Sequence, residues 1–340
     1  VTNDQLDVLA DLEANPRMLV QGAAGTGKTI IAQTFAKRLA EQQKQVLLLF
    51  FNRGIAKHAR SAFPKGSSVS VSTFSSFSKR LVEKCDPEWW GSQKESGSEF
   101  WHTTLPLKLL DIPSFELPRY DAVIVDEGQD FKPEWFEFLN TLLRDPLESH
   151  FTVLLDEKQD IFGHWRSFPC SPKPYHKTLT KNCRNTKQIV HYLNGKYPTN
   201  MVSFEQSPQG AAVRERVTTS EVDELAKLTE DIRSLTSKEG IKPGSIVILI
   251  QGSKEDSCLR NLTEIAGFPL QSTYTGYDTE MRCVFYSTID IFKGLEADVV
   301  LVCLAGLPPA DVPRALYVRG SRAKHLLHVY LRADHELSSA

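Results

Sequence analysis

Short apolar runs alternate with amphipathic segments through the first half of this chain. Near-continuous apolar stretches, typical of strands buried on both faces of a parallel sheet, occur at 18–20, 45–51, 121–125 and 151–155, and an alternating stretch occurs at 69–73. Helical spacing of apolar residues predicts helices at 3–14, 29–39, 53–62 and 74–83, the first with Asn3 as its N-cap. Strands that alternate with helices predict an α/β fold with a doubly wound parallel sheet.

The second half repeats this order after a proline-rich connector at 168–174, FPCSPKP. Strands are predicted at 176–180, 211–217, 246–251, 283–288, 298–304 and 326–331, and helices at 186–195, 221–238 and 255–266. We therefore expect two lobes, residues 1–168 and 169–340. Residues 86–119 are rich in Trp, Ser, Pro and Gly without clean periodicity, so we expect an insertion with short helices in the first lobe.

Composition limits the class of protein and the cellular location that we expect. The 340 residues are 41% hydrophobic, contain no apolar run long enough to span a bilayer, and begin with a polar stretch that is not a signal peptide. The six cysteines form no C-x-x-C pair, which argues against a zinc knuckle or a disulfide framework and favours a cytoplasmic location. The net charge of −2 does not point to nucleic acid, but a narrow strand-binding groove needs only local basic and aromatic groups. The chain starts with Val1, so a domain of a larger protein is one interpretation.

The clearest chemical motif is a glycine-rich turn between the first strand and the helix that follows it. It reads Gly22-Ala23-Ala24-Gly25-Thr26-Gly27-Lys28-Thr29 and matches the P-loop pattern G-x-x-x-x-G-K-[ST]. Glycines let backbone N–H groups curl around phosphates, and the helix N-terminus adds its positive dipole end. Lys28 is expected to reach the β- and γ-phosphates, and the Thr29 hydroxyl to ligate Mg²⁺.

A second motif follows the apolar run at 122–125. Asp126 and Glu127 stand at the carboxyl end of this strand, which in a doubly wound sheet faces the ligand crevice. Asp126 is expected to hold Mg²⁺, and Glu127 to orient and deprotonate an attacking water. A strand that ends in Asp-Glu is by itself often a solvated turn, but the upstream P-loop favours the catalytic interpretation.

The segment Asp126-Glu127-Gly128-Gln129-Asp130-Phe131 resembles the DE-x-QD motif of superfamily 1 helicases of the UvrD/Rep type. Further stretches resemble that family's motifs in order, and they are Gln5, 49–53, 73–77, 155–163, 179–184, Thr288 with 293–296, and 316–323. The resemblance runs from Gln5 to about Tyr330. It implies two tandem RecA-like P-loop NTPase lobes that use ATP and Mg²⁺.

The resemblance also implies roles for single residues. Gln5 would read the adenine, and Glu296 would contact the ribose. Gln159, Arg184 and Arg322 would converge on the γ-phosphate across the cleft between the lobes, where the two arginines would neutralise developing charge. For either arginine alone, a surface salt bridge is the alternative interpretation.

Single-stranded nucleic acid would cross both lobes. Asn52, Phe74 and Trp165 are the expected contacts on the first lobe, where the two aromatic rings would stack on bases. Core packing is the alternative for Phe74. Thr288 and Lys293 would contact backbone phosphates on the second lobe. Lys79, Arg80 and Lys187 are candidates for phosphate neutralisation or for ordinary solvated surface.

Several positions depart from the family pattern. Cys183 replaces the tyrosine that stacks on adenine, and Ile30 stands where an arginine is common, so strict ATP preference is open. Ser75 and Asp290 replace two motif histidines. The helical insertions of full-size enzymes are much reduced before Asp121 and essentially missing before Thr288, so the chain resembles the compact UvrD-like cores fused to nuclease-related domains in some bacterial proteins.

We therefore expect a nucleic-acid-dependent ATPase, a monomer that translocates on or unwinds single-stranded nucleic acid. DNA is favoured over RNA, and the polarity carried from the family is 3′→5′. The first alternative is an NTP-binding switch that binds nucleic acid or protein without unwinding. A small-molecule kinase would leave Arg184, 293–296 and Arg322 without a role, and a degenerate scaffold conflicts with intact Lys28, Asp126 and Glu127.

Overall fold

The computed structural model describes residues 2–93, 97–160 and 173–333. Its contacts divide the chain into two α/β units. Unit 1 comprises Val1–Gly22 with Gly27–Leu179, and unit 2 comprises Ala23–Thr26 with Thr180–Ala340. The division after Leu179 differs from the boundary that we expected after residue 168, and the tip of the P-loop groups with unit 2.

Unit 1 is built on a six-stranded parallel sheet in the order β3-β2-β4-β5-β1-β6. Its strands are β1 (Arg17–Gly22), β2 (Val46–Phe50), β3 (Val69–Thr73), β4 (Ala122–Val125), β5 (His150–Leu155) and β6 (Tyr175–Leu179). β1, β2, β4 and β5 are buried along almost their whole length, as their apolar runs predicted. The strands run parallel, so the P-loop after β1 and the acids after β4 share one edge of the sheet.

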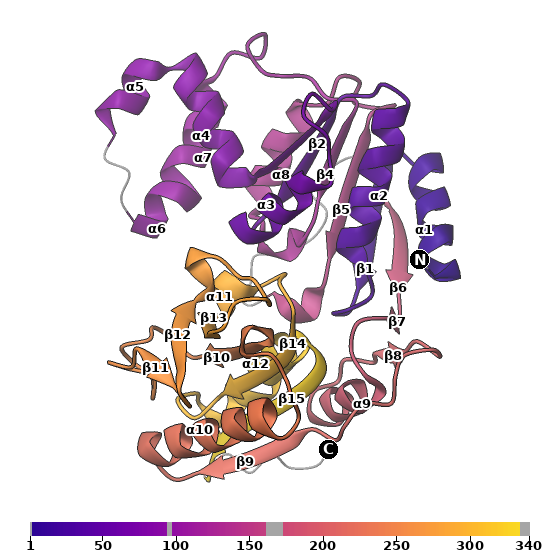
Figure 1. Ribbon diagram of the computed structural model, residues 1–340. Helices are drawn as coiled ribbons and strands as arrows, with labels where there is room; N and C mark the ends of the chain where they lie inside the picture. Colours follow the sequence, from indigo (N-terminus) through magenta and orange to yellow (C-terminus); the bar gives the residue numbers. More distant parts are fainter. Residues whose placement is uncertain (1, 94–96, 161–172, 334–340) are drawn as a thin grey trace. The chain divides into compact units, whose positions relative to one another are not determined.

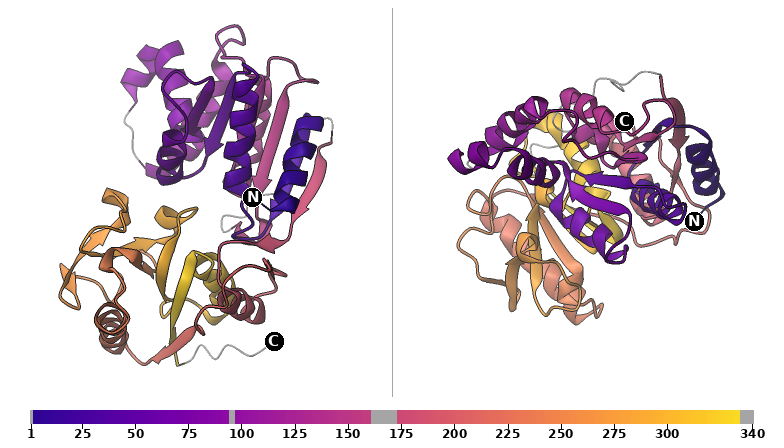
Figure 2. Two further views of the ribbon diagram at one scale, coloured as in Figure 1. Left: turned by 45° about the vertical axis from the view of Figure 1, so that its right-hand side comes forward. Right: turned by 90° about the horizontal axis from the view of Figure 1, so that it is seen from above.

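Helices lie on both faces of this sheet (Figures 1 and 2). They are α1 (Asn3–Ala14), α2 (Lys28–Glu41), α3 (Arg53–Ser61), α4 (Phe74–Cys85) and α8 (Pro133–Thr141). The inserted segment contributes α5 (Pro87–Ser92), α6 (Gly97–Glu99) and α7 (Leu105–Lys108). The N-cap of α1 is Thr2 rather than Asn3, because Thr2 and Gln5 form a reciprocal capping box.

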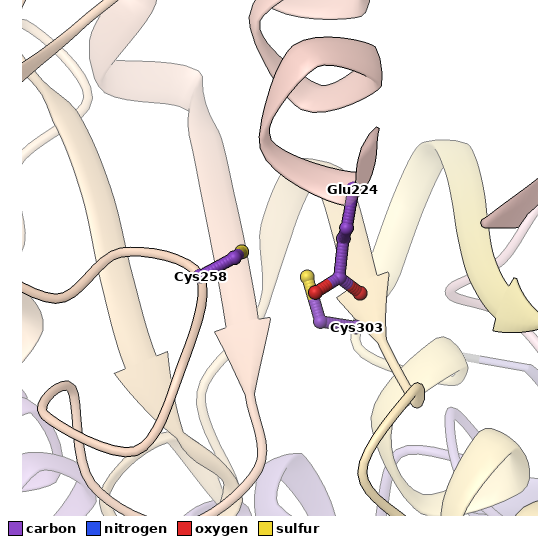
Figure 3. Close-up of side chains that lie close together, drawn as sticks. All are labelled: Glu224, Cys258 and Cys303. Carbon is purple, nitrogen blue, oxygen red and sulfur yellow. The ribbon is translucent and has the colours of Figure 1, made fainter. Parts of the chain in front are cut away.

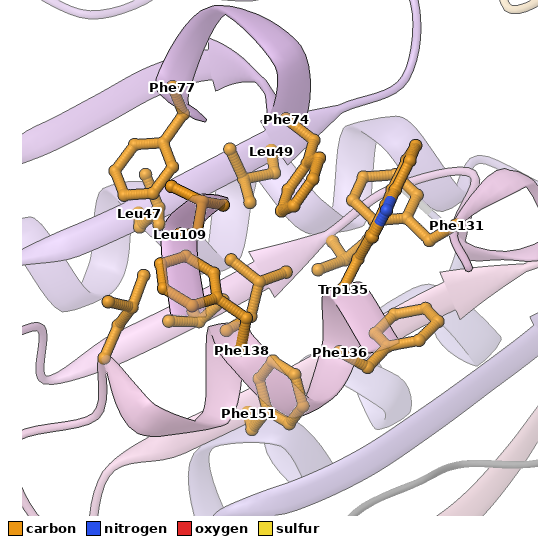
Figure 4. Packing of buried hydrophobic residues seen from close by; sticks show 14 of the residues in the cluster. Leu47, Leu49, Phe74, Phe77, Leu109, Phe131, Trp135, Phe136, Phe138 and Phe151 are labelled. Carbon is orange, nitrogen blue, oxygen red and sulfur yellow. The ribbon is translucent and has the colours of Figure 1, made fainter. Parts of the chain in front are cut away.

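An aromatic cluster fills one face of the sheet of unit 1 (Figure 4). Phe131, Trp135, Phe136 and Phe138 pack here against side chains of β2, β4 and β5. Helix α7 of the insertion adds Leu105 to the same cluster. The insertion is therefore part of the core of unit 1, and burial of its apolar side chains stabilises its short helices.

Unit 2 holds a seven-stranded sheet in the order β11-β12-β13-β10-β14-β15-β9, parallel except for the β11–β12 pair. Its strands are β9 (Arg214–Thr218), β10 (Ile246–Ile250), β11 (Glu264–Ile265), β12 (Phe268–Ser272), β13 (Val284–Thr288), β14 (Ala297–Cys303) and β15 (Ala323–Arg332). The helices are α9 (Lys187–Lys196), α10 (Glu221–Ser237), α11 (Ile289–Phe292) and α12 (Val312–Gly320), and β7 (Lys181–Asn182) pairs with β8 (Val202–Ser203). Among the described residues, no helix is both long and apolar enough to cross a membrane.

Two predictions about the second half were wrong. The strand expected to open the second lobe is β6, which pairs with β1 in the sheet of unit 1. The helix expected at 255–266 is a series of turns that leads into β11. Asn261 and Ala266 adopt positive φ there, and the Ser257 hydroxyl accepts a hydrogen bond from the Leu259 N–H, so local bonds replace the helical ladder.

Candidate nucleotide and nucleic-acid site

The stem of the P-loop is shaped by close packing at Gly27. This residue caps α2 with φ 89°, and a Cβ there would lie 2.3 Å from Nε2 of Gln5. The positive φ favours glycine, and any side chain here would displace the Gln5 amide. The α1 capping box holds Gln5, which is 5% exposed. Gln5, the expected adenine reader, thus lies directly beside the P-loop.

The two polar side chains after Gly27 are anchored within unit 1. The Lys28 ammonium donates to the Gly22 carbonyl at 2.7 Å. The Thr29 hydroxyl donates to Oδ2 of Asp126 at 2.6 Å, which joins the start of α2 to the end of β4. A hydroxyl and a carboxylate oxygen are hard ligands of the kind that Mg²⁺ prefers. Thr29 and Asp126 therefore fit the metal role expected of them.

The acid pair after β4 is buried and electrostatically loaded. Burial and the neighbouring Glu127 charge raise the pKa of Asp126 to about 6, against the opposing effects of the Thr29 hydrogen bond and the Lys28 charge. Glu127 adopts φ 55° and ψ 44°, a left-handed conformation that is uncommon and strained in a non-glycine residue. Glu127, the expected general base, thus has a strained backbone. The neighbouring Asp126 carboxylate has too little positive charge around it to offset its burial.

A line of hydrogen bonds connects Glu127 to Gln159 through unit 1. Nε2 of Gln129 donates to Oε2 of Glu127 at 2.6 Å, and Oε1 of Gln129 accepts from the Asp156 N–H at 3.0 Å. Nε2 of Gln159 in turn donates to Oδ2 of Asp156 at 2.8 Å. The line thus joins Glu127 in the turn after β4 to Gln159 in the turn after β5.

Close packing fixes the turn that carries Gln129. A Cβ at Gly128 would lie 2.4 Å from Cγ1 of Val153 on β5, so a larger residue would push the turn away from that strand. Gln129 and Asp156 were not among the predicted site residues. The Gln of the DE-x-QD resemblance was the available signal for Gln129.

The tip of the P-loop makes its contacts inside unit 2. The Ala24 N–H donates to the Tyr317 hydroxyl at 2.9 Å, and Nδ2 of Asn182 donates to the Ala24 carbonyl at 2.8 Å. The Cys183 N–H donates to the Gly25 carbonyl at 2.9 Å. Backbone groups expected to surround phosphate thus bond to protein groups in this structure, and Asn182 and Tyr317 are site neighbours that sequence reasoning missed.

The structure places the residues expected on the second lobe at three positions within unit 2. Nε of Arg184 pairs with Oε2 of Glu296 at 2.6 Å, so two of the predicted nucleotide contacts are neighbours. Arg322 is 1% exposed, and its Nε donates to the Val318 carbonyl at 3.2 Å. Thr288 occupies the N-cap position of α11, and Lys293, just after that helix, is 3% exposed.

A pocket of about 380 Å³ lies in unit 1 beyond the ends of β2 and β3, and we call it the aromatic pocket. Its walls are Phe51, Arg53, Thr73, Ser75, Gly97, Trp101 and His102. The Arg53 guanidinium lies 5.9 Å from the centre of the Trp101 ring, and the rings of Phe51 and His102 meet edge to face at 6.1 Å. Trp101 and His102 come from the insertion. They were not predicted as site residues, because this segment has no periodic pattern that would place them.

Two residues expected to contact nucleic acid on the first lobe, Phe74 and Asn52, have protein partners in the structure. Phe74 is 2% exposed and stacks on Trp135 at 4.4 Å, so it is a core residue and its expected role in base stacking was wrong. Oδ1 of Asn52 accepts from the Gly54 N–H at 2.7 Å and caps α3. Trp165 lies outside the described residues, as does most of the connector at 168–174.

Among the described residues, one group of potential metal ligands lies in unit 2 (Figure 3). Glu224, Cys258 and Cys303 are all buried, and their ligand atoms lie within 4.8 Å of one another. Burial raises the pKa of Glu224, an effect that hydrogen bonding to the two thiols opposes. The two cysteines also belong to the apolar core formed by α10, β10 and β14, so the group fits core packing.

The sequence of this chain matches a known protein family over most of its length. A model of the family described as Schlafen group 3, DNA/RNA helicase domain, matches residues 16–239, which is about two thirds of the chain. The matched range includes the P-loop, the acid pair, Gln159 and Arg184. No curated protein sequence matches the chain.

Among solved structures, the chain is similar to the crystal structure of Arterivirus nonstructural protein 10 (helicase), with a TM-score of 0.43 and 13% sequence identity. That alignment covers 97% of this chain and 62% of the viral chain, so the present chain spans less than two thirds of that protein. The family assignment therefore depends on the sequence match to residues 16–239. By that match, the chain belongs to the Schlafen group 3 DNA/RNA helicase domain family.

Proposed function

We propose that this chain is an ATP-dependent, Mg²⁺-requiring translocase or helicase of superfamily 1, of the UvrD/Rep type. It would move along single-stranded nucleic acid, DNA rather than RNA, in the 3′→5′ direction. The observation that carries the proposal is the hydrogen-bonded line Glu127–Gln129–Asp156–Gln159 beside the Thr29–Asp126 pair. The family assignment supports the nucleic-acid substrate.

The proposed chemistry is hydrolysis of the β–γ phosphate bond by water. Glu127 would accept a proton from the attacking water. The hydrogen bond from Gln129 would hold the Glu127 carboxylate in position for this step. Lys28 would exchange the Gly22 carbonyl for phosphate oxygens, and Gln159 would orient groups at the γ-phosphate. Thr29 and Asp126 would hold Mg²⁺, which supplies charge neutralisation at the phosphates.

The remaining nucleotide contacts are carried over from the resemblance. Gln5 would read the base and Glu296 the ribose, while Arg184 and Arg322 would neutralise charge on the γ-phosphate. Both arginines have protein partners in this structure, so nucleotide binding would require Arg184 to leave Glu296. The exposed Cys183 would leave the base without the family's stacking tyrosine.

We propose the aromatic pocket as the contact for nucleic-acid bases on unit 1. Trp101 and His102 would supply the stacking surface that Phe74 does not, and Arg53 and Ser75 would bind the adjoining backbone. Asn52, Trp165, Thr288 and Lys293 remain proposed contacts along the strand. The chain would act as a monomeric cytoplasmic motor core, extended by a fused or partner nuclease or effector domain.

The alternative function is a nucleic-acid-stimulated ATPase switch that does not unwind. The small size of the insertion favours it, because α5, α6 and α7 are short and join the core of unit 1. ATPase assays with single-stranded DNA, duplex DNA, RNA and no polymer, run beside a strand-displacement assay, separate the two. Stimulation by single strands together with displacement supports the motor, and stimulation without displacement supports the switch. Equal hydrolysis in all four conditions would contradict both.

Replacement of Trp101 by alanine tests the aromatic pocket. Loss of a stacked base costs about 1–3 kcal/mol, so we expect affinity for a single-stranded oligonucleotide to fall by about 5- to 150-fold. Fluorescence anisotropy measures this, with Trp90→Ala as the matched control. Trp90 belongs to the same insertion, but its ring contacts Lys79 and Phe100 and does not line the pocket. Equal affinities for the two variants would remove Trp101 from the site.

A further inference from the structure

A second and larger pocket lies in unit 1, at the opposite ends of the same strand and helix that border the aromatic pocket. It has a volume of about 730 Å³, and we call it the basic pocket. Its lining residues are Lys57, Arg60, Ser61, Phe63, Pro64, Lys65, Gly66, Ser67, Val69, Ser70, Val71 and Arg80. The end of α3, the following loop and the start of the edge strand β3 thus form its walls.

Four cations line this pocket, and none of its described lining residues carries a carboxylate. Within the described part of the chain, none of the four forms an ion pair. An Arg60 Nη donates to the Val71 carbonyl at 2.7 Å, and an Arg80 Nη donates to the Ser72 hydroxyl at 3.0 Å. Neutral acceptors therefore orient both guanidinium groups. Each guanidinium has five N–H donors, so most of them stay available for an anion.

The electrostatics of the pocket favour a negative ligand. Burial and repulsion from Arg60 lower the pKa of Arg80. A further cation stands close by, because the Lys37 ammonium lies 5.9 Å from the ring of Phe63, one of the lining residues. The chain as a whole carries a net charge of −2, so this concentration of positive charge is local. An anion would relieve the repulsion between the clustered cations.

Phosphate groups suit the chemistry of this pocket. Guanidinium and ammonium groups bind phosphate oxygens, and the hydroxyls of Ser61, Ser67 and Ser70 add neutral donors. Phe63 is the one aromatic side chain among the described lining residues, and it is half-buried, so these residues offer no exposed aromatic platform. The pocket is thus equipped to hold a backbone and not to read or stack bases.

The geometry connects this pocket to the aromatic one. β3 contributes Val69 to the basic pocket and Thr73 to the aromatic pocket, residues about 13 Å apart at the rise of a strand. That span corresponds to about three to four stacked nucleotides. We propose that the basic pocket binds the sugar–phosphate backbone of the nucleic-acid strand whose bases occupy the aromatic pocket. This inference deepens the proposed function and depends on it.

The test compares the charge-reversal variant Lys57→Glu/Lys65→Glu with a matched control, Lys173→Glu/Lys238→Glu. All four lysines are exposed, and both variants change the net charge equally. Anisotropy would be measured with single-stranded oligonucleotides lengthened by one nucleotide at a time, at several salt concentrations. For the wild type and the control we expect a step in affinity when the oligonucleotide gains about three to four nucleotides. The charge-reversal variant should lose this step and at least tenfold in affinity, and its salt slope should fall by about 1.4, or 0.7 for each lost phosphate contact.

Each other outcome has a defined meaning. Equal binding by both double variants overturns the proposal and leaves the cations as protection of the β3 edge against strand pairing. A variant that binds oligonucleotides normally but has lost binding of inorganic tripolyphosphate makes the pocket a small-anion site, which also overturns the proposal. A wild-type protein that binds no oligonucleotide contradicts the proposed function itself, and the inference fails with it. Thermal unfolding of all variants confirms that the fold is kept.

Discussion

Two of the fully buried aspartates, Asp126 in unit 1 and Asp231 in unit 2, have opposite surroundings. In unit 2, Asp231 on α10 accepts hydrogen bonds from Arg214 at 3.0 Å, from Arg216 at 3.2 Å and from the Tyr330 hydroxyl at 2.7 Å, and His328 lies at 3.2 Å. In unit 1, Asp126 accepts from the Thr29 hydroxyl and the Glu127 N–H, and an acid stands next to it. Both carboxyl groups are 0% exposed.

The pKa values of the two acids move in opposite directions. Burial disfavours the charge of Asp231, but hydrogen bonds from His328, Arg216 and Tyr330 outweigh it and hold its pKa well below the ordinary value. For Asp126, burial and Glu127 together raise the pKa to about 6. Protein donors thus compensate the negative charge of Asp231, whereas too few protein donors and cations surround Asp126 to compensate its charge.

We infer that this difference separates a structural acid, Asp231, from the proposed functional one, Asp126. The side chains around Asp231 join α10 to β9 and β15, so its charge stabilises the fold of unit 2. Asp126 costs stability where it stands, and a bound cation would remove that cost. We infer that a buried acid with too few protein partners marks the reactive site, whereas a well-paired one marks the scaffold.

The largest expected effect on stability comes from Asp231→Asn. The substitution removes the buried anion that accepts from Arg216 and the Tyr330 hydroxyl, while the partly exposed arginines regain water. We therefore expect the free energy of unfolding of unit 2 to fall by about 2–3 kcal/mol. Glu230→Gln is the matched control, because Glu230 is exposed and pairs with the same Arg216 at 3.3 Å. That variant should lose less than about 1 kcal/mol.

The probe for this comparison must report on unit 2. All five tryptophans precede residue 170, so their fluorescence follows unit 1 only. Hydrogen exchange of the α10 amides during urea unfolding reports on unit 2. Equal losses of stability for Asp231→Asn and Glu230→Gln would show that the buried Asp231 contributes no more to the stability of unit 2 than an exposed ion pair. This result would contradict the structural role given to Asp231.

A smaller effect of opposite sign is expected from Asp126→Asn in the absence of magnesium. The folded state binds the Asp126 proton more tightly than the unfolded chain, so the wild type loses stability as the pH rises from about 4 through 6. Asparagine avoids this loss but keeps only one of the two acceptor atoms. We therefore expect a gain of about 1–2 kcal/mol at pH 7, visible in urea unfolding followed by tryptophan fluorescence, and no gain below pH 4. A gain that does not depend on pH would show that the pKa of Asp126 is not raised.

The sequence predicted the place in the fold of those proposed site residues that lie in one short stretch of chain. The P-loop, Asp126 and Glu127 each stand at the end of an apolar strand, so local pattern and topology together placed them. Phe74 was misplaced because the same motif position can face a ligand or the core, and only the stacking on Trp135 decides. Trp101 has no periodic context, and its place in the wall of the aromatic pocket depends on the fold of the whole insertion.

The Asp231 cluster was also beyond prediction, for a different reason. Its members come from β9, α10 and β15, so only the order of strands in the sheet of unit 2 brings them together. The boundary between the units was misplaced because a proline-rich segment indicates a connector but not the sheet to which the next strand belongs. That choice depends on the pairing of β6 with β1, a non-local contact.

The most direct test of the account is ATP hydrolysis by Glu127→Gln, measured with single-stranded DNA and Mg²⁺ beside binding of a fluorescent ATP analogue. Glu134→Gln is the control, because Glu134 is an exposed acid at the start of α8, outside the site. If Glu127 is the general base, its replacement should lower the hydrolysis rate by about 10²- to 10⁴-fold, while nucleotide affinity stays within a few-fold of the wild type. Hydrolysis at the rate of the control would contradict the assignment of the acid pair as the catalytic centre.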